Sequence, residues 1–556
     1  MKKQLLALFS LLLPLLTFAQ EVEEEVGLDQ KIDEAFKPVS DFFSNVIFFE
    51  IMGTPFVLIL LVASAAFFTI YFGFPNIRFF GKAINVVRGK YDELDHPVAE
   101  AMYGDSTPGG DAIETIRDES KEGEVSHFQA LATAVSGTVG NGNIAGVALA
   151  IALGGPGATF WMIVCGLLGM STKFVECTLG VQYRDVGEDG TVYGGPMYYI
   201  SKGLKDKGFK TLGKVAAVLF AIFCIGGSFG GGNAAQSNQA TIVIKEMFAW
   251  ESTAAGALVG LVLAILVGII IIGGIKRIAS VTEKVVPFMA VLYVLCCLYI
   301  IGSNFSLIDD AIGLIVKEAF NPTAIGVGGF IGVLLVGFKR AAFSNEAGAG
   351  SASIAHSAVK TKYSASEGLV ALLEPFIDTV VICTMTALVI IIFNFGEAFD
   401  YGTIPGAVEQ ADGTFNAIIN GITYTDVEGK VLIGGELKEG AGITSSAFAQ
   451  YIPYSNVFLT IAVVLFAVST MISWSYYGLQ SWKFLFGRGK AADLTYKLLF
   501  LTFVVIGAAA SMGSIWAFSD AMIFAMVFPN MVGLYFLFPV VKKQLNRYLD
   551  AIKNRA

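Results

Sequence analysis

Long apolar runs separated by short polar segments dominate the chain from residue 47 onward. Eleven of these runs are near or above the roughly 20 residues that an α-helix needs to cross the hydrocarbon core of a membrane. The expected spans are residues 47–74, 128–154, 156–182, 213–242, 253–275, 281–303, 323–345, 367–394, 455–482, 495–512 and 515–541. The pattern predicts an all-α integral membrane protein with 11 transmembrane helices.

Basic residues in the polar segments gather on one side of this arrangement. If the spans alternate in direction, one side holds 26 Lys and Arg residues and the other holds six. Cytoplasmic loops carry the excess of Lys and Arg, so we expect the N-terminus outside and the C-terminal tail 542–556 in the cytoplasm. Residues 75–127 are then a cytoplasmic loop, and GGPMYYISKGL within 185–212 is expected to form a short interfacial helix on the same side. For the outer loop 397–450 we favour a plain solvated connection over a small lid.

The first 46 residues have a different character. Lys2 and Lys3 precede the apolar run LLALFSLLLPLL, and small residues follow before the acidic EVEEE. A basic start, a short apolar stretch and small residues at a polar junction are typical of a secretory signal peptide. We expect residues 1–19 to be this signal peptide, cleaved after Ala19, and residues 20–46 to be an extracytoplasmic segment. The alternative is an uncleaved first helix.

Composition supports a membrane protein and excludes other classes. Of the 556 residues, 55% are hydrophobic and 15% are charged, against roughly 25% charged in soluble domains. The net charge of −9 argues against nucleic acid as a partner. The six cysteines lie in apolar segments and the three histidines are scattered, so we expect no disulfide framework and no transition-metal site. No HExxH motif occurs, and three histidines are too few to serve as paired bases, so we expect neither an enzyme nor an organic cofactor.

The second span is interrupted by SGTVGNGNIAG, residues 136–146. Each glycine lowers helix propensity by about 1 kcal/mol relative to alanine, and backbone left unpaired in hydrocarbon survives only when it is buried in protein or lines a cavity. Side-chain oxygens of Thr138, Asn141 and Asn143 can replace lost partners. We therefore expect an unwound joint that binds a small cation and a carboxylate. A close helix crossing packed by glycines is the alternative, but it would not need the asparagines.

A second interruption, GFKRAAFSNEAGAGSASIAHSA, falls at residues 337–358 in the seventh span. Ionisable groups at membrane depth usually face one another or a cavity. We favour an ion pair between Glu346 and Arg340 over a role of Glu346 in holding the broken helix. Phe343, Ser344 and Asn345 lie at the expected break and are candidates for contact with a ligand.

The positions of the two breaks indicate an internal repeat. Without the first, peripheral span 47–74, the breaks fall in the first and sixth helices of a ten-helix core. The halves, residues 128–303 and 323–541, then have opposite topology because each holds five spans. Inverted repeats with broken helices near the membrane midplane are typical of secondary transporters.

Further polar residues lie within the other spans. The amides of Asn233, Gln236 and Asn238 could bind a carboxylate or an amino group, and the hydroxyls of Ser469 and Thr470 could ligate sodium, although such hydroxyls often bond within their own helix. The remaining intramembrane charged residues are expected to form structural pairs. They are Lys173, Glu176, Glu374, Asp378 and Asp520.

Several of these segments together resemble the alanine/glycine:cation symporter family, the bacterial sodium–alanine symporters. They are GTVGNGNIAGVALAI, GGPMYYI, NAAQSNQA, FKRAAFSNEAGAGSASIAHSA and STMISWSYYG, and the likeness extends from about residue 47 to residue 541. The signal peptide and the long outer loop depart from the family pattern, and Ser136 stands where a glycine is often found.

The resemblance implies a fold similar to that of the leucine-transporter superfamily. By that similarity, carbonyls near Ser136 and Val139 would bind sodium together with Ser469 and Thr470. The substrate would be met by residues of both breaks and two further spans: Thr138, Gly142, Asn143, Gln236, Phe343, Asn345 and Trp474.

These observations predict a sodium-coupled symporter for alanine, glycine or a similarly small amino acid, functional as a monomer in the inner membrane. Sodium is the expected coupling ion because hard cations prefer oxygen ligands. A proton-coupled transporter using Glu346 or Asp378 is the main alternative. An intramembrane enzyme lacks a catalytic constellation, and a channel would not accumulate its substrate against a gradient.

Overall fold

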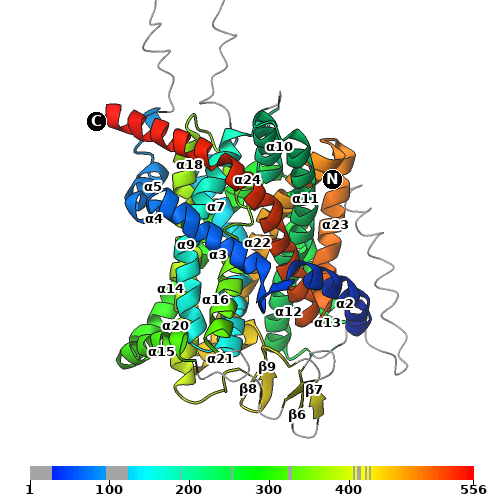
Figure 1. The fold of residues 1–556 in the computed structure, drawn as a ribbon. Coiled ribbons are helices and arrows are strands. Elements are labelled where there is room, and N and C mark those ends of the chain that lie inside the picture. Colours follow the sequence, from blue (N-terminus) through cyan, green and yellow to red (C-terminus); the bar gives the residue numbers. More distant parts are fainter. Residues whose placement is uncertain are drawn as a thin grey trace, which may run out of the picture.

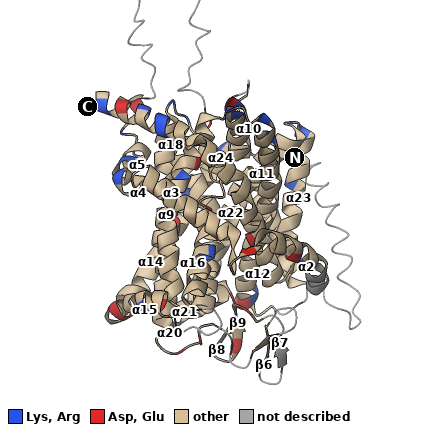
Figure 2. Ribbon diagram, in the orientation of Figure 1, with Lys and Arg blue, Asp and Glu red and all other residues tan. Residues whose placement is uncertain are grey.

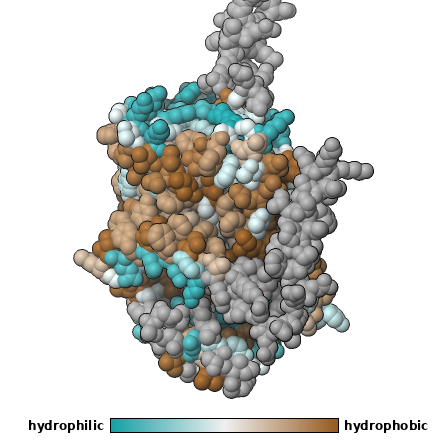
Figure 3. Space-filling model, turned by 90° about the vertical axis from the view of Figure 1, so that its right-hand side faces the viewer, coloured by the Kyte–Doolittle hydropathy of each residue, from teal (hydrophilic) through white to brown (hydrophobic). Residues whose placement is uncertain are grey.

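A computed structural model describes residues 28–94 and 123–555, except 188–189, 251, 253, 323–328, 403, 405–406, 410–414, 420–421 and 425–426. The expected signal peptide 1–19 lies outside the described residues, and so does most of the expected cytoplasmic loop 75–127. The elements form a helical bundle with small hairpins at one end (Figure 1). A belt of hydrophobic surface separates more hydrophilic ends (Figure 3).

Seven helical stretches in the described residues are long and apolar enough to cross a membrane. Five of them are single helices and two combine several elements: Gly157–Gln182 (α9), Lys210–Phe248, Gly274–Ser303 (α14), Ser364–Asn394, Ser455–Phe486 (α22), Lys490–Ala509 (α23) and Met512–Arg555 (α24). A bent pair, His127–Thr138 and Asn141–Gly154, passes the same test as one broken span. The membrane-spanning character predicted from the sequence is confirmed.

The other three expected spans contain shorter helices. These are Phe56–Tyr71 (α3), Ala255–Ile271 (α13) and Gly329–Asn345 (α16), of 16, 17 and 17 residues. They are shorter than the roughly 20 residues of a usual crossing, and α16 begins directly after the undescribed residues 323–328. Each predicted span therefore contains a helix in the structure. Helix length alone identifies eight crossings in the described residues when the bent pair is counted as one.

The chain before α3 corrects the predicted first span 47–74. An amphipathic helix, Leu28–Ile47 (α2), is followed by a tight antiparallel hairpin of Glu50–Ile51 (β1) and Thr54–Pro55 (β2). Gly53 at the turn has φ +74°, a conformation that favours glycine. The hairpin therefore interrupts the predicted span, and the helix begins only at Phe56. The Ser40 hydroxyl of α2 donates to the Ser514 carbonyl at 2.9 Å, fixing α2 against α24.

Short helices connect several spans. Pro75–Arg78 (α4), Phe80–Val87 (α5) and Asp92–Leu94 (η2) follow α3, and Phe305–Leu307 (η7) and Ile308–Phe320 (α15) follow α14. Asp185–Val186 (β3) pairs with Val192–Tyr193 (β4) before Pro196–Asp206 (α10). The α10 helix confirms the expectation of a short helix in 185–212, and one face of it is buried in the protein.

The outer loop 397–450 is more than the solvated connection we favoured. It holds Val408–Glu409 (β5), Phe415–Ile419 (β6), Ile422–Tyr424 (β7), Val431–Ile433 (β8) and Glu436–Lys438 (β9), all paired antiparallel. The helix Ala441–Tyr451 (α21) follows and buries Ala441, Ile443, Thr444, Ala447 and Phe448. The Thr444 hydroxyl donates to the Ile144 carbonyl at 3.2 Å, so the loop packs directly onto the first broken helix.

Candidate functional site

The first broken helix has the form that its glycines predict. Ser126 caps His127–Thr138 (α7) through a capping box with Gln129. Winding stops at Val139 and Gly140, and the chain resumes as Asn141–Asn143 (η5) and Ala145–Gly154 (α8), bent by 57°. A Cβ on Gly140 would lie 2.4 Å from Thr470 Oγ1. Glycine is therefore required here by close approach as well as by the break.

The second break follows α16. That helix ends at Asn345, and Glu346 adopts a left-handed φ of +55°. The Asn345 side-chain oxygen accepts the Ala347 amide at 3.0 Å. Helix is regained only at Ser353–His356 (α17). The expectation of a discontinuous helix at this place is confirmed.

A third irregularity was not predicted. The span after α10 begins as Lys210–Phe229 (α11), passes through a π-helical segment at Gly230–Ala234 (η6) and ends as Ala235–Phe248 (α12). Gln236 holds this segment against the first break, because its Nε2 donates to the Gly231 carbonyl at 2.9 Å and its Oε1 accepts the Asn141 amide at 2.9 Å. The run of three glycines was the available signal in the sequence.

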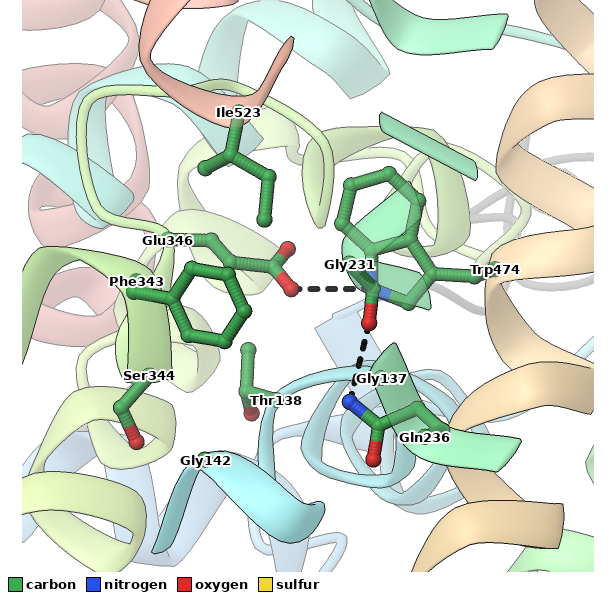
Figure 4. Close-up of a pocket in the computed structure, with 10 residues that line it drawn as sticks. All are labelled: Gly137, Thr138, Gly142, Gly231, Gln236, Phe343, Ser344, Glu346, Trp474 and Ile523. Carbon is green, nitrogen blue, oxygen red and sulfur yellow. Dashed lines mark hydrogen bonds between the residues drawn. The ribbon is translucent and has the colours of Figure 1, made fainter. Parts of the chain in front are cut away.

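These three irregular segments meet α22 and α24 at one buried cavity (Figure 4). The lining residues come from the two breaks, the span that contains η6, and the helices α22 and α24: Gly137, Thr138, Gly142, Gly231, Gln236, Phe343, Ser344, Glu346, Trp474 and Ile523. Five predicted substrate residues are among them, namely Thr138, Gly142, Gln236, Phe343 and Trp474. The two breaks are adjacent here, since a Cβ on Gly142 would lie 3.6 Å from Phe343 and from Ser344.

Glu346 lies in the cavity and does not pair with Arg340. One carboxylate oxygen accepts the Trp474 indole N–H at 2.9 Å, and the other accepts the Ser351 hydroxyl. Arg340 bonds Asp520 instead, and Lys339 reaches the same carboxylate at 3.1 Å. The predicted Glu346–Arg340 pair is therefore wrong. Glu346 lies beyond the end of α16 with a left-handed φ of +55°, whereas Arg340 lies within that helix.

The four residues of the predicted sodium site lie together, between α7 and α22. Thr470 Oγ1 donates to the Ser136 carbonyl at 3.0 Å, and the Ser136 hydroxyl donates to the Ser469 carbonyl at 2.7 Å. Val139 is buried at the end of α7. The Ser469 hydroxyl bonds the Phe466 carbonyl of its own helix at 2.9 Å.

Asn143 and Asn345 lie outside the cavity lining and bond the span that follows the second break. That span comprises Ser364–Ala371 (α18), Leu373–Pro375 (α19), a π-helical segment Phe376–Cys383 (η8) and Thr384–Asn394 (α20). Asn345 Nδ2 donates to Thr379 Oγ1 at 2.9 Å. Asn143 Nδ2 donates to Asp378 Oδ1 at 2.6 Å.

Asp378 is a fully buried carboxylate whose partners are uncharged. Besides the Asn143 amide, it accepts the Ser344 hydroxyl at 2.9 Å and the Thr379 hydroxyl at 2.7 Å. Among the described residues, no Lys, Arg or His is recorded within ion-pair distance of it. The expectation of a structural ion pair is therefore not met at Asp378. Glu176 likewise bonds an amide, that of Asn530, at 2.7 Å.

Asn233 and Asn238 have structural partners. Asn233 Nδ2 donates to the Phe500 carbonyl at 2.6 Å, and Asn238 Nδ2 donates to the Ala510 carbonyl at 2.8 Å. Both amides thus face α23 and its end. Of the three amides that the sequence singled out in this span, Gln236 alone lines the cavity.

A buried ionic network lies beside the cavity. The expected pairing of Lys173 with Glu374 is present at 3.0 Å. His356 Nε2 lies 3.5 Å from Glu374, and Glu367 joins His356 to His127 at the start of α7. Two of the histidines that are scattered in the sequence are thus united by folding. In the part of the chain that the structure describes, no group of three His, Cys, Asp or Glu residues has the arrangement of a metal site.

Comparison with known proteins relates this arrangement to transporters. A sequence model of the sodium:alanine symporter family matches residues 110–556. The chain is 37% identical over 503 residues to the sodium/alanine symporter AgcS of Methanococcus maripaludis, covering 90% of this chain and 96% of that protein. Two Bacillus subtilis proteins are also similar. One is the putative sodium/proton-dependent alanine carrier protein YrbD, with 36% identity over 430 residues, 76% of this chain and 81% of that protein. The other is the probable sodium/glutamine symporter GlnT, with 30% identity over 500 residues, 90% of this chain and 89% of that protein.

Proposed function

Because the chain belongs to the sodium:alanine symporter family, we propose that it carries alanine, glycine or a similarly small amino acid into the cell together with sodium. The observation that supports this most directly is the meeting of two broken helices at one buried cavity. Unwound backbone next to a cavity supplies dipoles and oxygens that an apolar helix pair does not.

The cavity offers complementary groups for a zwitterion. Gly142 of the unwound joint and the side-chain amide of Gln236 line the cavity and are the proposed partners of a carboxylate, and the Glu346 carboxylate is the proposed partner of an ammonium group. Phe343 and Trp474 bound the space from two sides (Figure 4). The charged groups of the substrate would thus exchange their bonds with water for bonds with partners of opposite polarity in the cavity.

Sodium would bind at the contact of α7 and α22. The Ser136 and Val139 carbonyls and the Ser469 and Thr470 hydroxyls are its proposed ligands, all oxygen as a hard cation prefers. The existing bonds among Ser136, Ser469 and Thr470 support this set. An ion here would hold the unwound end of α7 in one conformation and so raise the affinity of the cavity for substrate, and by reciprocity the substrate would raise the affinity for sodium.

The surrounding architecture is proposed to be the five-plus-five inverted repeat, residues 128–303 and 323–541, with α3 outside it. The C-terminus and α10 would face the cytoplasm and the hairpins β5–β9 the outside. Lys and Arg concentrate at the end with α5, α10 and the C-terminus (Figure 2), in agreement with the rule for cytoplasmic loops. Alternating access would arise from rocking of helices around the fixed site.

A liposome assay with the purified protein tests the proposal. Uptake of labelled alanine is measured with and without an imposed inward sodium gradient. Saturable uptake above the external concentration, dependent on sodium, is expected. Uptake that depends on neither a sodium gradient nor a pH gradient, or that does not saturate, would contradict symport and favour a channel.

Proton coupling is a second candidate, and Asp378 is the observation that favours it. A carboxylate at membrane depth with uncharged donors is stabilised by a proton or a cation. Asp378 contacts both breaks through Asn143 and Ser344. Uptake that persists without sodium and collapses when the pH gradient is removed would establish this alternative and overturn the first.

A further inference from the structure

One wall of the cavity comes from α24, a helix that contributed no residue to the predicted site. Ile523 of α24 lines the cavity, is 2% exposed and extends its side chain toward the space between Phe343 and Trp474 (Figure 4). These three apolar side chains come from three different helices. They face the polar residues Thr138 and Gln236 across the cavity.

The glycines of η6 allow this wall to close tightly. A Cβ on Gly231 would lie 2.6 Å from Ile523 Cδ1 and 3.4 Å from the Phe343 ring. A Cβ on Gly232 would lie 2.1 Å from the Trp474 side chain. Real Cβ atoms are essentially never found within 3.0 Å of another heavy atom, whereas 3.4 Å from the Phe343 ring is ordinary van der Waals contact. The cavity therefore has no spare room at Gly231, and its extent there is set by the position of the Ile523 side chain.

We infer that Ile523, held against Gly231, determines the size of the substrate side chain that this transporter accepts. This inference rests on the proposed function and narrows it to amino acids with a side chain of about one carbon. Glycine and alanine fit with Ile523 in place, whereas a branched side chain would need the volume that Ile523 occupies. The Trp474 indole is bonded to Glu346 at 2.9 Å, and the Phe343 ring stacks on Trp516 with ring centroids 4.9 Å apart. Ile523 is the third apolar wall, and neither kind of contact holds it.

Three substitutions test the inference, two that enlarge the cavity and one that narrows it. Ile523→Ala removes three carbons from the wall. The binding of valine or leucine relative to alanine should therefore strengthen by about tenfold or more, which is the usual effect of a methylene or more in an apolar pocket. Ile523→Val removes Cδ1 alone and should admit 2-aminobutyrate first. Gly231→Ala adds a methyl group toward Ile523 and should weaken the binding of alanine by about tenfold relative to the binding of glycine. Combining Gly231→Ala with Ile523→Val should restore the binding of alanine.

Binding and transport are measured separately so that the two proposals can fail independently. Each purified variant is titrated with glycine, alanine, 2-aminobutyrate, valine and leucine in sodium buffer, and the shift of its unfolding temperature is recorded beside liposome uptake. Ile390→Ala, a fully buried isoleucine of α20 away from the cavity, is the matched control and should keep the wild-type order of ligands.

Size-dependent binding that changes in the variants as described supports the inference even if the wild type shows no sodium-driven uptake, which would instead overturn the proposed function. An unchanged order of the five amino acids in Ile523→Val and Gly231→Ala overturns the inference, and so does failure of the wild type to bind any of them. If Ile523→Ala does not fold, the other two variants still decide.

Discussion

At the scale of single residues, the structure separates side chains that face the cavity from those that hold its walls. Thr138, Gln236 and Trp474 belong to the first kind, and Asn143 and Asn345 bond η8 instead. Asparagine and glutamine carry the same amide group, and the sequence does not show which way each side chain points in the fold. The sequence therefore predicted all five residues as substrate contacts, and the structure places three of them in the cavity lining.

Thr470 provides the most direct test of the sodium site. Thr470→Ala removes the hydroxyl that bonds the Ser136 carbonyl at 3.0 Å and one proposed ligand, so half-saturating sodium for alanine uptake should rise about tenfold, equivalent to about 1.4 kcal/mol. Sodium-activation curves in proteoliposomes measure it. Thr502→Ala, which loses a bond within the exposed part of α23, is the control; equal curves for both variants would remove Thr470 from the site.

Glu346 tests recognition of the ammonium group. Glu346→Gln keeps an oxygen acceptor for the Trp474 indole and removes the negative charge. Since hydrogen bonds to charged groups contribute about 1.5–3 kcal/mol, alanine affinity should fall at least about tenfold while the unfolding temperature changes little. Equilibrium binding of labelled alanine measures this. Unaltered affinity in a folded variant would show that the carboxylate serves the Trp474 bond alone.

At the scale of elements, irregular helices rather than regular ones bring the site together. The glycines of α7–η5 and the turn after α16 correctly predicted two discontinuous helices. The π-helical segments η6 and η8 were not predicted. A π-helical turn adds one residue to a turn without a distinctive residue type, so its signal is weak even in a run of glycines.

The glycine at the first break is predicted to be irreplaceable by the smallest side chain. Gly140→Ala would place a methyl group 2.4 Å from Thr470 Oγ1 and 3.0 Å from Gln236 Oε1, so sodium-dependent uptake should fall by more than about tenfold. Gly81→Ala in exposed α5, where a Cβ meets nothing within 4 Å, should leave uptake unchanged and stabilise slightly. Similar uptake by the two variants would contradict the close contact of α7 and α22.

The ionic network joins elements that the breaks leave separate. Glu367 of α18 accepts from His127 of α7 and His356 of α17. Removing a partner from a buried charged pair costs about 3–5 kcal/mol, so Glu367→Ala should lower the unfolding temperature markedly. Glu283→Ala, which loses one amide bond from Gln129 on a part-exposed face, should cost about 1 kcal/mol. Equal thermal shifts in detergent would show that the network is not a fastening between α7 and α18.

At the scale of the whole molecule, the distribution of charge predicts the orientation in the membrane. The excess of Lys and Arg at one end predicts that Glu436 in β9 faces outside and Arg488 faces the cytoplasm. In intact cells, a membrane-impermeant thiol reagent should label Glu436→Cys and spare Arg488→Cys until the cells are opened. The unsubstituted protein is the control, since its six cysteines lie in apolar segments. Labelling in the reverse pattern would invert the proposed topology.

The sequence by itself determined the class of molecule, the approximate helices and the two discontinuous helices. Those features depend on local physics: hydrocarbon requires long apolar runs, and glycine with asparagine weakens a helix wherever it stands. Ser469 and Thr470 were candidates from the sequence alone, and the family resemblance added Ser136 and Val139 to the predicted sodium site. Tertiary structure decided that Glu346 faces Trp474 rather than Arg340, that α21 covers the broken helix and that Ile523 closes the cavity. Each of these joins segments tens to hundreds of residues apart, or depends on one backbone angle, and such contacts are fixed by how helices pack rather than by any pattern along the chain.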